Sequence, residues 1–320
     1  MPSSKNKKRN KIVLLTGASG FIGRHAIPCL LKRNYIVHAI AHRSKLRIIK
    51  NKQLIWHKCD LLQSEVREQL ISQIKPSHLL HFAWYLDHKK YWTSAENLNW
   101  AQASICLLRH FAENGGRRVV CAGTCAEYDW NYGLCSEYLT PLNPATLYGI
   151  CKNSLHLIFS KYASIAGLSY AWGRIFSVFG PYERQERLVP SVISSLLKNR
   201  IMRCTNGNQI RDYLHVEDVA AAFVALLDSD ITGPVNIASG KPVALKDLVA
   251  LIASKLKKKT LIRFTKQSST KRNIQLLTAS VNRLQNEVRW QNRFSLEQGL
   301  MHTITWWKKQ DLNKRRRQSN

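Results

Sequence analysis

Short apolar runs alternate with longer amphipathic stretches through the first half of the chain. The runs are typical of buried strands, and the stretches between them repeat their apolar positions at helical spacing. The runs predict strands at 12–16, 35–41, 54–58, 78–83, 118–122 and 169–175. The stretches predict helices at 20–32, 63–74, 93–114 and 143–166. This alternation indicates an α/β fold, a doubly wound parallel sheet with helices on both faces.

Glycines fall at 17, 20 and 23, directly after the first predicted strand. Glycine lets the backbone reverse without a Cβ clash and lets a diphosphate approach the main-chain N–H groups. The start of the next helix, with its dipole, then favours phosphate. The turn therefore predicts a Rossmann-type dinucleotide site, unless it is only a tight connection. Its candidate cofactor contacts are Gly17, Ser19, Gly20, Phe21, Ile22 and Gly23.

The end of the second predicted strand bears on which dinucleotide binds. An NAD site usually has Asp or Glu there for the adenosine ribose hydroxyls, whereas this chain has Ala-His-Arg-Ser-Lys at 41–45. Arg43 is placed to meet a 2′-phosphate, which favours NADP(H); NAD(H), with Arg43 stacked on adenine, is the alternative. Asp60 and Leu61 follow the third strand and are candidate adenine contacts, unless Asp60 caps the next helix.

From Gly180 the pattern loosens into shorter elements. We therefore expect a dinucleotide-binding domain at 11–179 and a mainly substrate-binding lobe at 180–307, with some segments returning to the first domain. The formal net charge is +29, and Lys and Arg crowd both ends. These runs predict disordered basic tails at 1–10 and 308–320. Such charge also suits nucleic acid, but no nucleic-acid-binding motif accompanies it.

The eight cysteines form no C-x-x-C pair, and most lie in apolar segments. This usage predicts reduced thiols in a cytoplasmic protein, without disulfides or a metal site. No apolar run approaches the roughly 20 residues of a membrane span, and the N-terminal stretch does not have the pattern of a signal peptide.

Tyr148 and Lys152 are four residues apart in the predicted helix 143–166, so they share one face of it. An ammonium stabilises a phenolate, so Lys152 is expected to depress the pKa of Tyr148. The strand that ends near residue 122 brings Thr124 to the same edge of the sheet. We therefore predict Thr124, Tyr148 and Lys152 as catalytic residues; a chance pair on a helix surface is the alternative.

Together these motifs resemble the extended short-chain dehydrogenase/reductase superfamily, in its nucleotide-sugar epimerase/dehydratase/reductase branch, over about residues 11–307. The family's glycine motif matches 16–23, and its Ser/Thr…Tyr-x-x-x-Lys triad matches Thr124, Tyr148 and Lys152. Further matches are Asn99 and the stretches 174–181, 207–218 and 235–240.

The resemblance implies further contacts. Arg211 would hold a nucleotide diphosphate by charge-assisted hydrogen bonds, and Ser177 stands where many relatives carry Asn for the substrate phosphate. Phe176 would flank the nicotinamide, and Ala83 would line the cofactor path. The aromatic residues Trp84 and Tyr85 would face the sugar, unless they pack at the sheet edge.

Departures from the family pattern narrow the reaction. Dehydratases of this branch follow the threonine with Asp-Glu, whereas this chain has Cys125-Ala126; Glu127, one position later, is interpreted as structural or sugar-contacting. We expect NADPH-dependent reduction of a 4-keto-6-deoxy nucleotide sugar, with the proton from Tyr148. The alternatives are a nucleotide-sugar 4-epimerase with tightly bound NAD and, more remotely, a non-catalytic NADP-sensing or nucleic-acid-binding protein.

The predicted helices 93–114 and 143–166 carry apolar residues beyond one stripe. In the family, such helices pair across a twofold axis into a four-helix bundle. The resemblance therefore implies a homodimer; the alternative is that one chain covers both faces of these helices.

Overall fold

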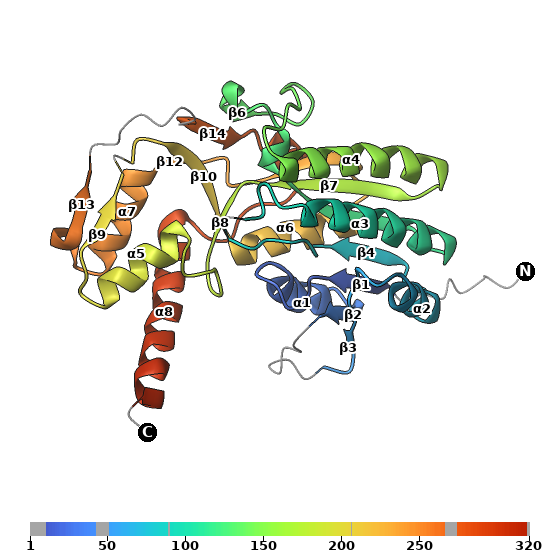
Figure 1. Cartoon of the computed structure of the whole chain (residues 1–320), viewed down its shortest axis with the longest axis horizontal. Helices are drawn as coiled ribbons and strands as arrows, with labels where there is room; N and C mark the ends of the chain where they lie inside the picture. The colour runs from blue at the N-terminus through green and yellow to red at the C-terminus, as the bar shows by residue number, and fades with distance from the viewer. Residues whose placement is uncertain (1–10, 43–50, 89, 206, 266–273, 319–320) are drawn as a thin grey trace, which may run out of the picture.

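The computed structural model describes residues 11–42, 51–88, 90–205, 207–265 and 274–318 (Figure 1). Its centre is a seven-stranded sheet in the order β11-β7-β5-β4-β1-β2-β3, in which every pairing is parallel. The strands are β1 (Ile12–Thr16), β2 (Ile36–Ala41), β3 (Leu54–Lys58), β4 (His78–His81), β5 (Arg118–Thr124), β7 (Ser169–Ile175) and β11 (Gly233–Ile237). The predicted doubly wound sheet is confirmed.

Helices cover both faces of this sheet. On one face, α1 (Gly23–Lys32) and α6 (Val216–Asp228) bury apolar side chains against β1, β2 and β5. On the other face lie α2 (Ser64–Ile74), α3 (Glu96–Glu113) and α4 (Leu147–Ile165). The strand order reverses direction at β1, so the crevice between the carboxyl ends of β1 and β4 is where a doubly wound sheet binds its ligand.

A smaller lobe lies beside the carboxyl end of the sheet (Figure 1). Its strands are β8 (Ser177–Phe179), β10 (Ile210–His215), β12 (Pro242–Ala244) and β14 (Leu276–Ala279), with the pair β9 (Met202–Cys204) and β13 (Ile262–Phe264). Its helices α5 (Leu188–Leu197), α7 (Leu245–Lys255) and α8 (Leu296–Gln318) enclose a separate core. Four single-turn elements complete the described chain: η1 (Cys125–Glu127), η2 (Trp130–Tyr132), η3 (Lys259–Leu261) and η4 (Arg283–Glu287).

Segments cross the expected boundary at residue 179 in both directions. The segments α6 and β11 follow the boundary in sequence but belong to the larger layer, whereas β6 (Leu134–Cys135) precedes it and pairs with β14 of the smaller lobe. The two parts are therefore interlocked, which fixes the position of one relative to the other.

The expectation of a disordered tail at 308–320 is wrong for residues 308–318, because α8 runs to Gln318. Trp307 is buried in the core of the smaller lobe and anchors the helix. Lys, Arg, Leu and Gln, which make up most of the following residues, are good helix formers. The predicted tail at 1–10 lies outside the described residues. Within the described chain, none of the helices has both the length and the apolar character required to cross a bilayer.

Candidate active site

The turn from β1 to α1 packs so closely that two of its glycines are required. Gly17 has a φ of 65°, and a Cβ atom there would lie 2.9 Å from the backbone nitrogen of Ala83. A Cβ atom on Gly23 would lie 2.2 Å from the carbonyl oxygen of Gly17. The start of α1 therefore rests directly on the turn, and only glycine fits at position 23.

The start of α1 fits the diphosphate of a dinucleotide. Ile22 occupies the N-cap position, no side chain forms a cap hydrogen bond, and the first turn contains no acidic residue. Its N–H groups and positive dipole end therefore suit an anion. Ser19, Phe21 and Ile22 would hold the diphosphate through their backbone N–H groups, whereas the Gly20 N–H donates to the Gly17 carbonyl oxygen over 2.9 Å within the turn.

A buried chain of hydrogen bonds fixes the other side of the crevice. Thr16 Oγ1 lies 2.7 Å from His81 Nδ1, and His81 Nε2 lies 3.0 Å from Ser104 Oγ. The Thr16 hydroxyl also accepts a hydrogen bond from the backbone N–H of Ala83, which places Ala83 beside Gly17 as expected for the cofactor path. Sequence reasoning missed His81 and Ser104; the available signal was two polar residues inside apolar runs.

The end of β2 carries His42, whose Nδ1 lies 3.6 Å from Asp60 Oδ2. Asp60 Oδ1 accepts a hydrogen bond from the backbone N–H of Leu62, ahead of α2, whose N-cap is Gln63. Asp60 therefore shapes the loop and does not cap the helix. Leu61 is buried beside it, and Arg43 lies outside the described residues.

Tyr148 lies in the first turn of α4 and is 8% exposed. The Thr146 side chain caps this helix by accepting a hydrogen bond from the Gly149 N–H. The Tyr148 ring packs edge-on against Tyr91 and Trp92, at centroid distances of 5.1 and 5.7 Å. The phenol is thus held in an aromatic enclosure at the carboxyl end of the sheet.

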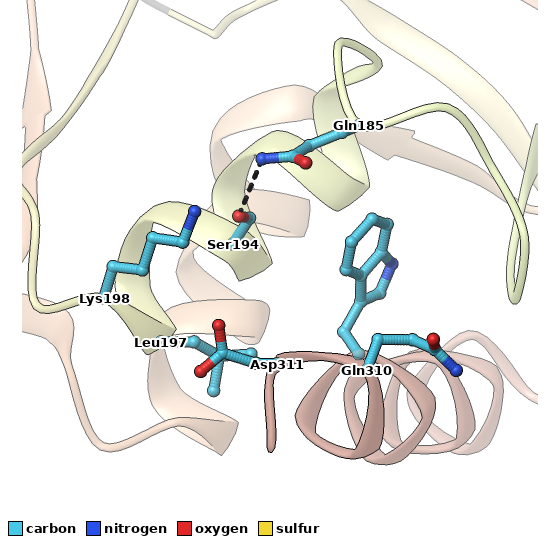
Figure 2. A pocket seen from close by; sticks show the side chains of 7 residues that line it. Gln185, Ser194, Leu197, Lys198, Gln310 and Asp311 are labelled. Carbon is cyan, nitrogen blue, oxygen red and sulfur yellow. Dashed lines mark hydrogen bonds between the residues drawn. The ribbon is translucent and has the colours of Figure 1, made fainter. Parts of the chain in front are cut away.

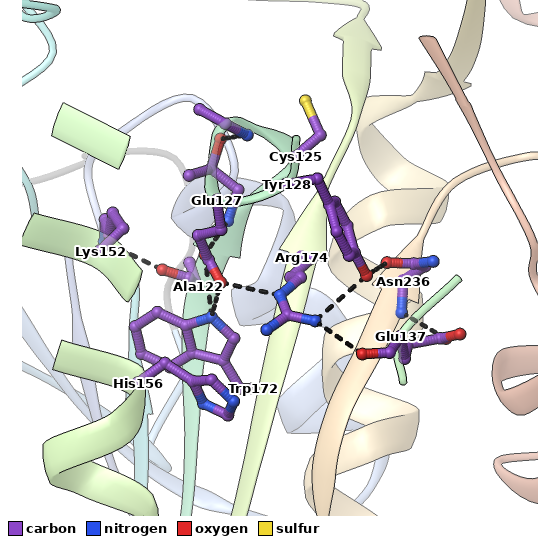
Figure 3. Close-up of polar contacts among 12 residues, drawn as sticks. Ala122, Cys125, Glu127, Tyr128, Glu137, Lys152, His156, Trp172, Arg174 and Asn236 are labelled. Atoms are coloured by element: carbon purple, nitrogen blue, oxygen red, sulfur yellow. Dashed lines mark hydrogen bonds and ion pairs between the residues drawn. The ribbon is translucent and has the colours of Figure 1, made fainter. Parts of the chain in front are cut away.

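The expected depression of the Tyr148 pKa is wrong. Burial raises the pKa of this phenol above its ordinary value, and a hydrogen bond with the Thr124 side chain opposes part of the rise. Lys152 does not produce the expected effect because its Nζ is directed elsewhere. It donates to the carbonyl oxygen of Ala122 over 2.9 Å (Figure 3). It also lies 3.7 Å from the ring centroid of Trp84. Burial lowers the pKa of Lys152 to about 8.

Thr124 ends β5 and is positioned by a buried carboxylate. Its backbone N–H donates to Glu127 Oε1 over 2.7 Å, while its hydroxyl accepts from the Ala126 N–H. Glu127 is fully buried and also binds Trp172 Nε1 and Arg174 Nε (Figure 3). Of the two interpretations of Glu127, the structural one is therefore correct and sugar contact is excluded.

Two positions near the site differ from their expected roles. Asn99 lies on the exposed face of α3 and contacts Glu96, whereas Asn97 is fully buried. Asn97 binds Trp84 Nε1 through its Oδ1 and the Tyr91 carbonyl through its Nδ2. The Trp84 ring also lies against Lys152, so these two contacts hold it in place; its contact with the sugar stays a prediction.

The structure also places the remaining candidate residues. Tyr85 and Trp84 join Tyr91 and Tyr148 in one aromatic cluster. Phe176 is buried between β7 and β8, and Ser177 pairs with Tyr213 of β10. Arg211 donates to the carbonyl oxygens of Ile210 and Ile274 and interacts electrostatically with Cys125, next to Thr124.

Two other hollows lie elsewhere. A cavity of about 20 Å³ between α5 and α8 is lined by Gln185, Ser194 and Trp307, among others (Figure 2); this volume holds about one water molecule. A larger hollow of about 530 Å³ runs beside α4, β7 and β11, where Glu137, His156 and Arg174 line it. Thr124, Tyr148 and Lys152 line neither one. All eight cysteines are free, and the described residues contain no cluster of three or more His, Cys, Asp or Glu suited to a metal ion.

The fold and the site define a Rossmann-type protein with a Thr, Tyr and Lys set placed behind a dinucleotide-binding turn. A family model for the NAD dependent epimerase/dehydratase family matches residues 13–238. The chain belongs to this family and is an enzyme.

Individual relatives are nucleotide-sugar enzymes. The chain is 27% identical over 247 residues to a dTDP-6-deoxy-L-talose 4-dehydrogenase (NAD(+)) of Aggregatibacter actinomycetemcomitans, covering 74% of this chain and 87% of that protein. It is 28% identical over 253 residues to a CDP-abequose synthase of Salmonella typhimurium, and the match covers 75% of this chain and 79% of that protein. The solved structure of a UDP-N-acetylglucosamine 4-epimerase from Methanobrevibacter ruminantium M1 has the same fold, with a TM-score of 0.84 and 24% sequence identity. The superposition covers 94% of this chain and 99% of that one.

Proposed function

We propose that this enzyme reduces a 4-keto-6-deoxy nucleotide sugar and uses NADPH as the reductant. The observation that carries the proposal is the buried Tyr148 hydroxyl beside Thr124, in surroundings that keep the phenol protonated. A protonated phenol is ready to donate, and the reduction of a ketone requires a proton donor. Two similar proteins, a 4-dehydrogenase and an abequose synthase, are named for chemistry on deoxysugar nucleotides.

Each residue then has a defined task. When bound, NADPH supplies the hydride to C4. Thr124 donates a hydrogen bond to the carbonyl oxygen, and Tyr148 gives its proton to the developing alkoxide. Lys152, anchored on the Ala122 carbonyl, lies under the Trp84 ring, which packs edge-on against Tyr148, and so supports the aromatic cluster that positions the phenol. Arg211 and Ser177, on the small lobe, would bind the diphosphate.

The preference for NADPH rests on the end of β2, where the described chain offers His42 and no carboxylate for a ribose. The nearest acidic group, Asp60, already binds the Leu62 N–H and faces His42. Eight free cysteines support a reducing compartment, the cytoplasm, where NADPH is available.

A 4-epimerase with tightly bound NAD is the second candidate, because proteins of this fold include a 4-epimerase. An epimerase must first remove a proton from a hydroxyl, so Tyr148 would have to act as a base. The raised pKa of Tyr148 favours the reductase.

The test is an absorbance assay of NADPH and NADH oxidation against 4-keto-6-deoxy sugars carried on TDP, CDP, GDP and UDP. A reductase consumes one NADPH per sugar, and Tyr148→Phe should lower kcat at least 100-fold. Tyr162→Phe, on the same helix but packed into the core beneath it, is the matched control and should retain activity. Interconversion of epimers without net oxidation would identify the epimerase, and no affinity for either dinucleotide would refute both proposals.

A further inference from the structure

Glu183 is a buried carboxyl at the entrance to the small lobe that the reaction described above does not use. Its side chain is 9% exposed, and among the described residues its Oε2 atom is buried without a hydrogen-bond partner. A carboxyl oxygen that loses its water and gains no partner destabilises the fold. Groups of this kind are retained mainly where function requires them.

The backbone that carries Glu183 is also strained. Tyr182 has a φ of 71°, a left-handed conformation that costs energy for any residue with a Cβ atom. Its ring packs on Trp306 at 4.8 Å, and the Arg24 guanidinium lies 4.0 Å from its centroid. Contacts with α8 and α1 therefore hold Tyr182 on the outer side, and the strained turn directs the next residue, Glu183, inward.

The surroundings of Glu183 connect it to the catalytic tyrosine. Its charged and titratable neighbours are Arg187 and Tyr213. The Arg187 guanidinium lies 5.9 Å from the ring centroid of Tyr91, which packs on Tyr148 at 5.1 Å.

A second contact joins this segment to the same loop. Arg184 Nη1 lies 3.5 Å from Asp87 Oδ1, in the loop after β4. The segment 183–187 thus lies against the loop that contains Asp87 and Tyr91, and the aromatic side chains of this loop pack on Tyr148.

We propose that Glu183 is a substrate-binding residue whose carboxyl group hydrogen-bonds a hydroxyl group of the hexose. The proposal rests on the proposed function, because it assumes a nucleotide-sugar substrate. A hydroxyl both donates and accepts, so it would give the buried Oε2 the partner that it lacks, beside the Gly180 backbone and Arg187, with which the carboxyl group already interacts.

Protonation makes this role compatible with a doubly charged substrate. Burial raises the pKa of Glu183 to about 8, although Arg187 opposes the rise. The carboxyl is therefore mostly neutral at pH 7 and does not repel a diphosphate. Above pH 8 it becomes an anion that faces Arg187, Tyr213 and the more distant Arg211. Lys152 also titrates near pH 8, so only a comparison with a variant isolates Glu183.

Titration calorimetry on the NADPH-saturated enzyme tests the proposal. It measures the affinity for UDP-glucose, dTDP-glucose, CDP-glucose and GDP-mannose, and compares each with the affinity for the corresponding free nucleoside diphosphate. For the nucleotide that binds the wild type best, Glu183→Leu should weaken binding of the nucleotide sugar at least tenfold. It should weaken binding of the free nucleoside diphosphate less than twofold. The same variant should raise Tm by about 2–4 °C, because it removes a buried oxygen without a partner. Glu186→Gln, on the exposed side of the same segment, should change neither quantity.

Glu183→Gln keeps the shape but cannot ionise. Its affinity for the nucleotide sugar should match that of the wild type at pH 7 and exceed it increasingly above pH 8; this comparison decides the case even if Glu183→Leu does not fold. Equal weakening of the sugar-bearing and sugar-free ligands, or identical pH profiles for wild type and Glu183→Gln, would overturn the role of Glu183. A wild type that binds none of the four nucleotide sugars would instead overturn the proposed function.

Discussion

Arg174 and Glu127 form an ion pair with an Nε–Oε2 distance of 2.7 Å, and neither side chain is more than 1% exposed. The same carboxylate accepts the backbone N–H of Thr124 and the indole N–H of Trp172. A carboxylate that lies in the core thus also positions a residue of the site. Glu127 therefore couples the stability of the fold to the position of Thr124.

Glu127→Gln tests this coupling. The substitution leaves the buried Arg174 guanidinium without its counter-charge, and breaking a buried pair from one side costs about 3–5 kcal/mol. The free energy of unfolding in urea should fall by this amount. Glu113→Gln removes an exposed partner of Arg109 and should change it by less than about 1 kcal/mol. Equal values for the two variants would contradict the coupling.

The lowered pKa of Lys152 predicts a change of stability with pH. The folded protein releases the Lys152 proton near pH 8, whereas the unfolded chain holds it to about pH 10.5. Because the unfolded state binds more protons between these values, the contribution of Lys152 to stability increases as pH rises. Relative to Lys152→Met, wild type should gain on the order of 2–3 kcal/mol between pH 8 and pH 10.5.

Urea unfolding of both proteins at several pH values measures this difference. The comparison cancels the buried tyrosines, which titrate at higher pH in both proteins. A constant difference across the range would show that Lys152 is not buried as a titrating ammonium.

His81 predicts a change of the same sign on the acidic side, where stability again rises with pH. Burial lowers its pKa to about 3, so the folded protein keeps the ring neutral while the unfolded chain protonates near pH 6.5. Stability should therefore fall as pH decreases from 6.5. Relative to His81→Asn, wild type should lose on the order of 3 kcal/mol between pH 6.5 and pH 4. Thermal unfolding of the two proteins across this range checks it, and parallel curves would refute it.

The fold was predictable because its signals are local. The apolar run at 12–16, the glycines that follow it and the alternation of strands and helices each reflect one strand or one turn, and β1, β3 and β7 have the predicted bounds. The end of α8 was not predicted, because a run of Lys and Arg has the same appearance in a solvated helix as in a disordered tail.

Backbone positions near the site were predictable where a motif fixes them, as for Gly17, Gly23 and Thr124. The directions of side chains could not be predicted from the sequence. The four-residue spacing places Tyr148 and Lys152 on one face of α4, but the Ala122 carbonyl and the Trp84 ring, which decide where the ammonium lies, are distant in sequence. The motif match pointed to Asn99, whereas Asn97 is the buried asparagine. The cause is the same, because only the packing of α3 shows which of the two is buried.

The outer surface of α3 and α4 leads to a prediction about assembly. These helices pack side by side (Figure 1), and apolar side chains remain exposed on both: Leu98, Ile105, Ile150, Leu157, Ile158 and Ile165. A group of exposed apolar side chains of this size is typical of an interaction surface. We expect a homodimer formed by these two helices and their copies.

Light scattering at micromolar concentration should give twice the chain mass of 36.7 kDa. Leu157→Glu places a charge in the expected interface and should give a monomer that retains its secondary structure. Leu139→Glu alters a side chain that is more exposed, at 84%, but lies outside both helices, and it should remain a dimer. A monomeric wild type, or two variants with the same mass, would show that these apolar side chains do not join two chains.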